Sequence, residues 1–592
     1  MTRQAPTYAV TVTRWLACAL LLAASGGCRL TRPLDPASLW SGSPTATGSG
    51  SATTAMGSRS AAEITELLEQ ATRLEKREDP RCVDLYATAA LAAYPAVQAD
   101  AEGPELPQAT KRYHQGLAGL LRTAVRHERF GPDWSIRLKS DEGWKQIKSS
   151  FHGNRWRADD YDTIKLACRF DRKELKRNWA SVGLGVPLVA VRKSDPGETF
   201  LGERIPFSST AVLQASFAGP ESDDVIGTLE FHDPLSEDAV VVGSHPRPIT
   251  RDLSAPLALA ESEFNSDAIK NFLKPERVDN RAGLKMTEPY CPGKVPVIFV
   301  HGLVSDNFTW VNMYNDLRAT PEFADRFQFW AFQYATGQSF LQSGSELRSG
   351  LQEVIAKYDP EGKDPALQHM VLVGHSMGGL VSKLQVTTSG TQLWDQYVSE
   401  PLAELELPEQ NATNLSNNFF FEPNPSVRRV VFIGSPHKGS KWAHNFLARI
   451  GSNLVRMSSD RTELLKKLIK ENPGVFHNSL KKGLPSSVDL LRKDSPLLGG
   501  MYDLPVSPRV NLHTIIGTGR PFLDGTPADG VVPVASARHP GTVSELMVDA
   551  THTELTGHPD SVAELRRILG VHLDEYDHQV RTKQSHEPVA KL

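Results

Sequence analysis

One stretch of the chain combines a serine with the small residues that a reactive serine needs. Residues 371–380 read Val-Leu-Val-Gly-His-Ser-Met-Gly-Gly-Leu, which is a short apolar run, a Gly-x-Ser-x-Gly motif and a helix start. This order predicts a tight strand-to-helix turn that exposes Ser376 above the end of a sheet. Gly374 and Gly378 are expected because side chains there would collide where strand and helix cross. Ser376 is therefore the candidate nucleophile, and the backbone amide of Met377 is a candidate donor to a bound oxyanion.

A serine hydroxyl becomes a good nucleophile only when a histidine takes its proton and a carboxylate orients that histidine. In folds where the serine lies at such a strand-to-helix turn, the three residues follow the chain order serine, acid, histidine. Asp529, within Asp-Gly-Val-Val-Pro, is the candidate acid, and Asp524 is its alternative. His552 directly follows the last expected strand and is the candidate base. His558, which opens the final helix expected at residues 560–569, stays open as an alternative base.

A second oxyanion donor is expected from the loop after the first long strand, where the sequence reads His301-Gly302-Leu303. Gly302 lets the backbone approach a substrate, and the amide of Leu303 is the expected donor. We interpret His301 as a hydrogen-bonding brace of this loop, not as a second base. No metal or organic cofactor is implied by this chemistry.

The elements that would position these residues begin at about residue 285. Strands are expected at residues 295–300, 327–334, 370–373, 429–433, 512–516 and 546–548, with a crossover helix at 346–358. Strands that alternate with helices predict an α/β fold with a mainly parallel sheet. Ligands bind at the carboxyl ends of the strands in such sheets, where all the candidate residues above would lie.

Two insertions interrupt this pattern. Residues 441–510 carry apolar residues at helical spacing, among them Phe446 and Leu454, and predict a helical cap that is either a mobile lid or a fixed cover. Residues 388–425 contain several aromatic residues, namely Trp394, Tyr397, Phe419, Phe420 and Phe421. These aromatic side chains could contact an acyl chain or a membrane, but core packing is the more frequent outcome.

Two further modules precede residue 285. Residues 61–130 contain three apolar patterns at helical spacing, which predict a small helical module that packs on the rest of the chain or docks a partner. Residues 131–284 contain short β-type runs separated by Gly, Pro, Asp and Ser, which favours an antiparallel β-rich module. His232 and Asp233 could be drawn there as a catalytic pair, but a satisfied loop histidine is the better interpretation. The sequence indicates no function for either module.

The first sixty residues are expected to form a targeting segment followed by a tether. Basic residues precede an apolar stretch that ends in small residues and Cys28, which predicts an export signal at residues 1–28. Cys28 resembles the acylated cysteine of a bacterial lipobox, although Ser25 stands where an aliphatic residue is usual; ordinary cleavage is the alternative. Residues 29–60 are rich in Ser, Gly, Thr and Ala and are expected to form a flexible tether. A lipid-anchored protein of the cell envelope is the expected location.

Length and charge set further bounds. At 592 residues the chain exceeds a single hydrophobic core, so two or three domains are expected. A formal net charge of −4 gives no electrostatic reason to expect nucleic acid as a partner. No run reaches the roughly 18 apolar residues of a conventional membrane span. After Cys28 only Cys82, Cys168 and Cys291 remain, which are too few for a disulfide scaffold and are not spaced as a metal site.

Four motifs together resemble the α/β-hydrolase lipases and esterases. They are Val-His-Gly-Leu at 300–303, Gly-His-Ser-Met-Gly at 374–378, Gly-Ser-Pro-His-Lys-Gly-Ser at 434–440 and Asp-Gly-Val-Val-Pro at 529–533. The chain looks most like the bacterial triacylglycerol-lipase-like branch, and it is also similar to deacylases of glycosylphosphatidylinositol anchors. The resemblance covers about residues 285–575, which leaves a tail at 576–592. The resemblance implies that His437 has a structural role. Relatives often carry glycine where this chain has Thr551, so His558 remains an alternative to His552 as the base.

The resemblance implies a serine ester hydrolase that cleaves a carboxylic ester, expected to be a lipid ester, through an acyl-enzyme intermediate. The implied fold is an α/β-hydrolase fold with a helical cap, preceded by the helical and β-rich modules. Two other functions stay open: an acyltransferase that uses the same residues, and an envelope scaffold with a vestigial hydrolase domain. The expected partners are a small-molecule or lipid ester and a membrane; protein partners are not indicated.

Overall fold

The computed structural model describes residues 59–99, 106–140, 143–153, 155–173, 175–195, 197–202, 204–215, 225–264, 283–303, 305, 307–440, 469–477 and 490–586. The expected export signal, Cys28, nearly all of the tether and most of the expected cap lie outside these residues. Within the described ranges the cysteines Cys82, Cys168 and Cys291 are free thiols. No helix in these ranges is both long and apolar enough to cross a bilayer.

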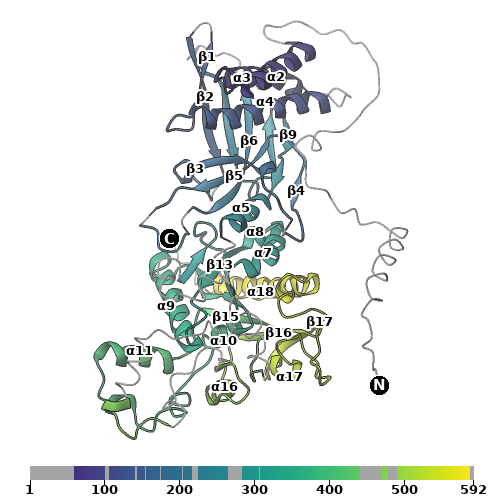
Figure 1. Ribbon diagram of the computed structural model, residues 1–592. Coiled ribbons are helices and arrows are strands. Elements are labelled where there is room, and N and C mark those ends of the chain that lie inside the picture. The colour runs from purple at the N-terminus through teal and green to yellow at the C-terminus, as the bar shows by residue number, and fades with distance from the viewer. Residues whose placement is uncertain are drawn as a thin grey trace, which may run out of the picture. The chain divides into compact units, whose positions relative to one another are not determined.

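The C-terminal domain, residues 283–586, is built on a seven-stranded sheet (Figure 1). Its strands are β11 (Gly283–Met286), β12 (Val295–Val300), β13 (Phe327–Gln333), β14 (Met370–His375), β15 (Val427–Ile433), β16 (Asn511–Gly517) and β17 (Thr542–Val548). The strand order is β11-β13-β12-β14-β15-β16-β17. Only β11 is antiparallel to its neighbour, and the other neighbouring strands run parallel. The predicted mainly parallel α/β sheet is confirmed.

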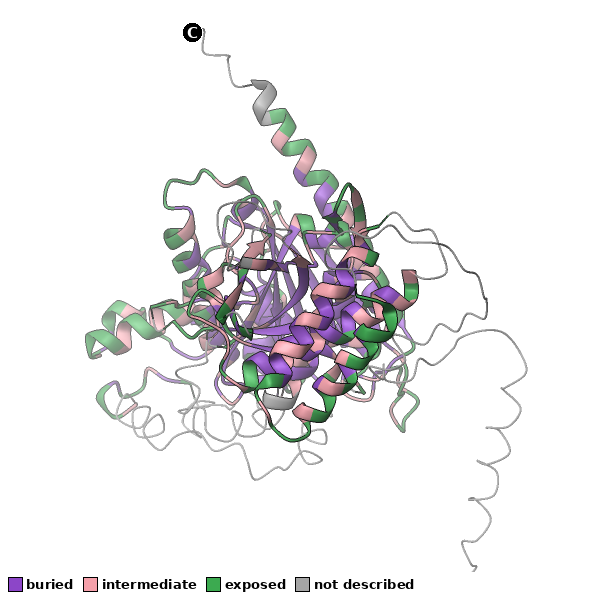
Figure 2. Ribbon diagram, turned by 90° about the horizontal axis from the view of Figure 1, so that it is seen from above, coloured by how far each residue is buried: buried purple, intermediate pink, exposed green. Residues whose placement is uncertain are grey.

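Helices cover both faces of this sheet. They are α7 (Val311–Arg318), α8 (Pro321–Arg326), α9 (Phe340–Tyr358), α10 (Met377–Lys383) and α18 (Pro559–His586). Alternate residues of β14 belong to different hydrophobic clusters: Met370 and Leu372 pack with residues of α9 and α10, and Val371 and Val373 pack with residues of α7 and α18. The strand reads as one continuous apolar run because it is buried on both faces. Figure 2 shows strands coloured as buried at the centre of the view, with exposed residues on the helices and loops around them.

Two helices extend beyond their predicted bounds. Helix α9 begins at Phe340 instead of residue 346. Ser339 caps it, because its side chain accepts a hydrogen bond from the backbone amide of Leu341 in the first turn. Helix α18 continues from the predicted end at 569 to His586, so the predicted start of a tail at 576 falls inside a helix. Its buried face continues past Gly570 with Leu573 and Tyr576, and this packing offsets the low helix propensity of the glycine.

The N-terminal domain, residues 61–264, packs helices on a six-stranded sheet. Helices α3 (Arg81–Gln98) and α4 (Leu106–Arg126) contact this sheet, α2 (Ala61–Glu75) packs on these two helices, and α5 (Ala255–Phe264) contacts β5 and β6. The strands are β1 (Ile136–Ser140), β2 (Gly143–His152), β3 (Tyr161–Leu166), β5 (Val186–Arg192), β6 (Pro206–Ala215) and β7 (Val225–His232). Helices α2, α3 and α4 share one hydrophobic cluster with the sheet, and the Tyr113 hydroxyl of α4 donates to the Leu213 carbonyl of β6 at 2.8 Å. The predicted helical and β-rich modules therefore have one core, and the helices pack on the rest of the chain.

The prediction of an antiparallel module is wrong for one pair of strands. Strands β2 and β7 run parallel, with His152 opposite His232, and the other neighbours in this sheet are antiparallel. Three strands of the sheet lie between β2 and β7 in the chain, so no hairpin turn imposes an antiparallel direction. The parallel pairing brings the carboxyl ends of β2 and β7 together. The predicted domain boundary at 284 also shifts, because it falls within β11 of the C-terminal sheet.

The aromatic insertion at residues 388–425 packs mainly into the core. Trp394, Tyr397 and Phe421 are buried, and Phe419 and Phe420 pack against the same cluster. The insertion also lines a cavity of about 770 Å³, whose walls include Trp394, Leu402 and Phe420. The described part of the expected cap, residues 469–477 and 490–510, contains helix α16 (Pro496–Tyr502).

Candidate active site

Ser376 lies at a strained turn between β14 and α10. Its backbone has φ 54° and ψ −124°, a region that residues other than glycine rarely adopt. The Ser376 amide donates to the carbonyl of Ile433 at 2.9 Å, and the Ser376 carbonyl accepts from the amide of Gly379 at 3.0 Å. Strain of this kind costs about 1–3 kcal/mol and persists only where the surrounding structure holds it. The structure therefore has the strand-turn-helix geometry that the Gly-x-Ser-x-Gly motif predicts.

The glycines around this turn are required by close contacts. A Cβ atom on Gly378 would collide with a backbone carbonyl of β12, and one on Gly374 would collide with the carbonyl of Gly378. A Cβ atom on Gly302 would lie 3.0 Å from the Cβ atom of Ser376. The loop that carries Leu303 therefore passes directly against the serine.

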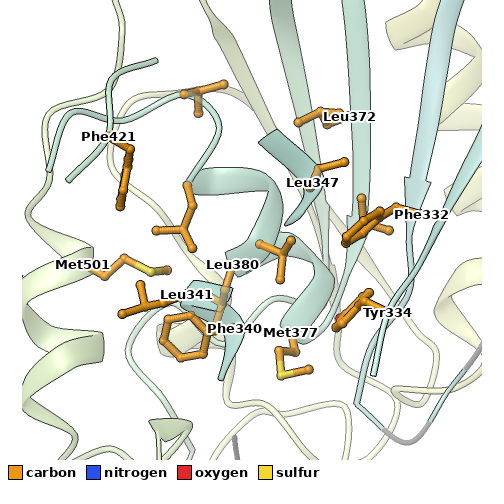
Figure 3. Packing of buried hydrophobic residues seen from close by; sticks show 14 of the residues in the cluster. Phe332, Tyr334, Phe340, Leu341, Leu347, Leu372, Met377, Leu380, Phe421 and Met501 are labelled. Carbon is orange, nitrogen blue, oxygen red and sulfur yellow. The ribbon is translucent and has the colours of Figure 1, made fainter. Parts of the chain in front are cut away.

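Helix α10 is anchored by apolar side chains below the turn. Met377 and Leu380 are fully buried and belong to a cluster that includes Phe340 and Leu341 of α9 and Tyr334 after β13. Figure 3 shows these side chains packed around the start of α10. This packing places the Met377 amide at the serine end of the helix.

Asp529 and His552 meet in the loops that follow β16 and β17. The Nδ1 atom of His552 lies 2.7 Å from Oδ2 of Asp529, and the two residues are 4% and 2% exposed. The other carboxylate oxygen accepts from the amides of Val531 at 2.9 Å and Val532 at 2.7 Å. Burial raises the pKa of Asp529, but the hydrogen bond and charge of His552 and the two amides outweigh it and hold this pKa below its ordinary value. A charged Asp529 keeps the proton of His552 on Nδ1, so Nε2 is the nitrogen that can accept a proton.

His375 and Gly434 hold this pair close to the turn. The Nε2 atom of His375 donates to the carbonyl of His552 at 3.0 Å, and the two ring centroids are 4.7 Å apart. Burial lowers the pKa of His375 to about 3, which keeps the ring neutral. Gly434 has φ +57°, and a Cβ atom there would lie 3.3 Å from both Oδ2 of Asp529 and Nδ1 of His552. The role of His375 could not be predicted from the sequence, because the Gly-x-Ser-x-Gly motif leaves its second position unspecified.

Asp524 and His558, the alternative acid and base, make hydrogen bonds with residues close to them in the chain. The Nδ1 atom of His558 accepts from the Asp560 amide at 3.3 Å at the start of α18, and its side chain is 28% exposed. Asp524 is exposed and accepts from a backbone amide two residues later. The structure thus joins His552 to Asp529, the first candidate for each role.

His301 braces the loop after β12. Its ring stacks on Tyr334 with centroids 4.4 Å apart, Nε2 accepts from the Tyr334 amide at 3.4 Å, and Nδ1 donates to the Gly302 carbonyl at 3.0 Å. The Tyr334 hydroxyl donates to the His301 carbonyl at 2.6 Å. Burial lowers the pKa of His301 to about 4, so it stays a neutral hydrogen-bonding residue, as expected.

His437 lies in a buried group of basic side chains. Its ring contacts Phe432 and His539, with centroids 4.5 and 4.9 Å away. Burial and the nearby charge of Lys383 lower the pKa of His437 well below its ordinary value. The Nζ atom of Lys383 donates to the carbonyl of Tyr502 at 3.0 Å, and burial lowers the pKa of this lysine to about 7. A neutral, buried His437 fits the structural role that the resemblance implies.

The cavity in the aromatic insertion is separate from these groups, since Ser376, Asp529 and His552 are not among its lining residues. The chemistry that the arrangement supports is therefore set by the loops beyond β12, β14, β16 and β17. There, a strained serine with the first amide of α10, the loop of Leu303, and the buried residues Asp529 and His552 come from four separate segments.

Comparisons with known proteins agree with this fold. Residues 292–417 match the family model of the PGAP1-like alpha/beta domain, a segment that contains Ser376 and ends before Asp529. Among curated proteins no relative matches the chain.

Solved structures with a similar fold include bacterial lipases and esterases. The mature Bacillus licheniformis lipase BlEst2 shares 18% identity over 48% of this chain and 93% of its own, with a TM-score of 0.28. Staphylococcus hyicus lipase shares 15% identity over 50% and 99%, with a TM-score of 0.32, and EstA from Clostridium botulinum shares 14% over 49% and 93%, with a TM-score of 0.29. Because these TM-scores are low, the fold assignment rests on the sheet order, the turn at Ser376 and the matched segment. On that basis the C-terminal domain has an α/β-hydrolase-like fold.

Proposed function

We propose that the protein is a serine hydrolase that cleaves a carboxylic ester, with a lipid ester as the preferred substrate. The observation that carries this proposal is the hydrogen bond between Asp529 and His552 beside the strained turn of Ser376. An oriented histidine with one proton-accepting nitrogen is what a serine nucleophile needs. The fold alone would not support this function, because one fold hosts many activities.

In this proposal the Ser376 hydroxyl oxygen attacks the ester carbonyl carbon while Nε2 of His552 takes the hydroxyl proton. The charge of Asp529 stabilises the imidazolium, and the amides of Leu303 and Met377 stabilise the oxyanion. One such amide is worth about 3 kcal/mol of transition-state stabilisation. His552 then protonates the leaving alcohol, and a water molecule activated by the same histidine hydrolyses the acyl-enzyme.

A lipid substrate is supported by the resemblance to lipases and by the expected acylation of Cys28, which would hold the enzyme at a membrane. If Cys28 is acylated, Cys28→Ser should release the protein from the membrane fraction. Unchanged partitioning of this variant would contradict the anchor without affecting the proposal for Ser376.

The proposal can be tested with a fluorophosphonate probe and a panel of esters of graded chain length. The wild-type chain should be labelled and should hydrolyse esters, and Ser376→Ala should lose both properties. Ser382→Ala is a matched control, because this buried serine lies on the same helix and its hydroxyl donates to the backbone carbonyl of Gly378. Labelling or hydrolysis that survives in Ser376→Ala would contradict the proposal. Labelling without hydrolysis, together with transfer of the acyl group to added glycerol, would indicate an acyltransferase.

A further inference from the structure

The N-terminal domain brings three metal-ligating side chains together at one end of its sheet. His152 and His232 are the last residues of β2 and β7 and lie opposite each other in the parallel pair. Their rings are stacked, with centroids 4.7 Å apart. Glu237 follows in the turn after β7, and its Oε2 atom lies 2.5 Å from Nδ1 of His232. One ligand atom from each of the three residues lies within 4.8 Å of the other two.

The outer nitrogens of both histidines are engaged by polar side chains. Nε2 of His232 lies 3.1 Å from Oε2 of Glu230, and Nε2 of His152 lies 3.0 Å from the Ser150 hydroxyl. Glu230 in turn accepts from the Gln214 amide group at 2.9 Å. A metal-bound histidine usually has its second nitrogen hydrogen-bonded in this way, which sets the tautomer and the direction of the ring. Since Nε2 of each ring is engaged in this way, Nδ1 is the nitrogen of each ring that would bind a cation.

Two other interpretations fit less of the cluster. His232 and Asp233 do not form a catalytic pair, because Asp233 pairs with Arg155 at 3.3 Å and both nitrogens of His232 contact glutamates. A protonated His232 held between Glu230 and Glu237 would account for those three residues. It would give no role to His152, although the strand register places that ring directly against His232.

We propose that His152, His232 and Glu237 bind a divalent cation of the zinc class, with water in the fourth position. Two imidazole nitrogens and one carboxylate oxygen are a donor set that suits Zn²⁺, whereas Ca²⁺ and Mg²⁺ prefer oxygen ligands. The cation would take the place between Nδ1 of His232 and Oε2 of Glu237, and this distance would widen to admit bonds of about 2.0–2.2 Å.

A cation bound at this site would link the turn after β7, through Glu237, to the ends of β2 and β7. Asp233 in the same turn pairs with Arg155, whose Nε atom lies 3.0 Å from Oε2 of Glu288 at the edge of the C-terminal sheet. The bound cation would therefore stabilise the segment that carries this buried ion pair. It would take no part in the chemistry at Ser376, so the inference stands apart from the proposed ester hydrolysis.

The test is a zinc titration of the full chain, purified without a polyhistidine tag and stripped with a chelator. Calorimetry and elemental analysis should find one tightly bound Zn²⁺ per chain, and zinc should raise the midpoint of thermal unfolding. Glu237→Gln and His152→Asn should each lose the tight site, and Glu230→Gln should keep one ion but bind it about 10–100-fold more weakly. His245→Asn, at a histidine of β9 (His245–Pro248), is the matched control and should bind zinc as the wild type does.

Co²⁺ in place of zinc should give the visible absorption of a four-coordinate site, and this absorption should be lost in Glu237→Gln. Circular dichroism of each metal-free variant shows whether it is folded, so that lost binding is not mistaken for unfolding. The absence of a tight ion in the wild type would overturn the proposal. So would a zinc ion that stays bound in both ligand variants, because it would have to lie elsewhere, for instance at His437 and His539.

Discussion

Two histidine–carboxylate pairs in this protein look alike and differ in what surrounds them. His552 with Asp529 and His232 with Glu237 each lie at the carboxyl end of a strand that has a parallel neighbour. Both histidines are 4% exposed, and their Nδ1–carboxylate distances are 2.7 and 2.5 Å. The two histidines therefore cannot be told apart by their burial or by this hydrogen bond, but the Glu237 side chain is 29% exposed and that of Asp529 only 1%.

The groups around each histidine distinguish the two pairs. Nε2 of His232 faces a second carboxylate, Glu230, and the ring stacks on another histidine. The His552 ring instead lies 4.7 Å from the ring of His375, next to Ser376, and its backbone carbonyl accepts from Nε2 of His375. The second oxygen of Asp529 accepts from the backbone amides of Val531 and Val532. The same two groups thus suit proton transfer in one place and cation binding in the other.

The largest expected effect is on the base. His552→Asn should lower kcat for ester hydrolysis on the order of 10⁶-fold, because no group would then take the Ser376 proton. His558→Asn and His152→Asn should leave kcat near its wild-type value, which steady-state kinetics on one ester can measure. A collapse of activity in His558→Asn with little change in His552→Asn would reassign the base and break the comparison.

The next effect is on the acid. Asp529→Asn should lower kcat by about 10⁴-fold, because an amide would favour the wrong tautomer of His552. Glu237→Gln makes the equivalent change in the other pair and should leave kcat unchanged while it abolishes zinc binding. Steady-state kinetics and zinc titration of Asp529→Asn and Glu237→Gln measure the two expected losses, of kcat and of zinc binding. If Asp524→Asn loses more activity than Asp529→Asn, the acid has been assigned to the wrong residue.

The smallest effect concerns the buried amine of Lys383. Burial lowers the pKa of Lys383 from 10.5 to about 7 despite the nearby charge of Asp503. Between these two pH values the unfolded chain binds a proton that the folded chain does not, so the free energy of unfolding should rise with pH in this window. The rise from this group is at most about 1.4 kcal/mol per pH unit.

Lys383→Met should flatten this rise and should stabilise the protein most below pH 7, where the wild type buries a charged amine. Urea unfolding at several pH values between about 6.5 and about 9.5 measures both slopes. Equal slopes in the two proteins would show that the pKa of Lys383 is not lowered in the folded protein. The contrast between this amine and the paired histidines would then be weaker.

The local patterns around Ser376 were sufficient to predict its turn. The apolar run of β14 and the glycines at 374 and 378 encode strand, crossing and helix within ten residues, and the structure has all three. Chain order also limited the acid to Asp529 or Asp524 and the base to His552 or His558. Local pattern could not choose within each pair, because all four lie in loops whose course depends on the sheet.

By itself, therefore, the sequence determined the α/β class of the C-terminal domain, the turn at Ser376 and a short set of partners for it. Only the tertiary structure decided that Asp529 bonds to His552, that His375 supports that histidine, and that His152 meets His232 across a parallel pair. The physical reason is one of range. Burial periodicity and glycine geometry act between residues close in the chain, whereas strand order and register join residues as far apart as 152 and 232.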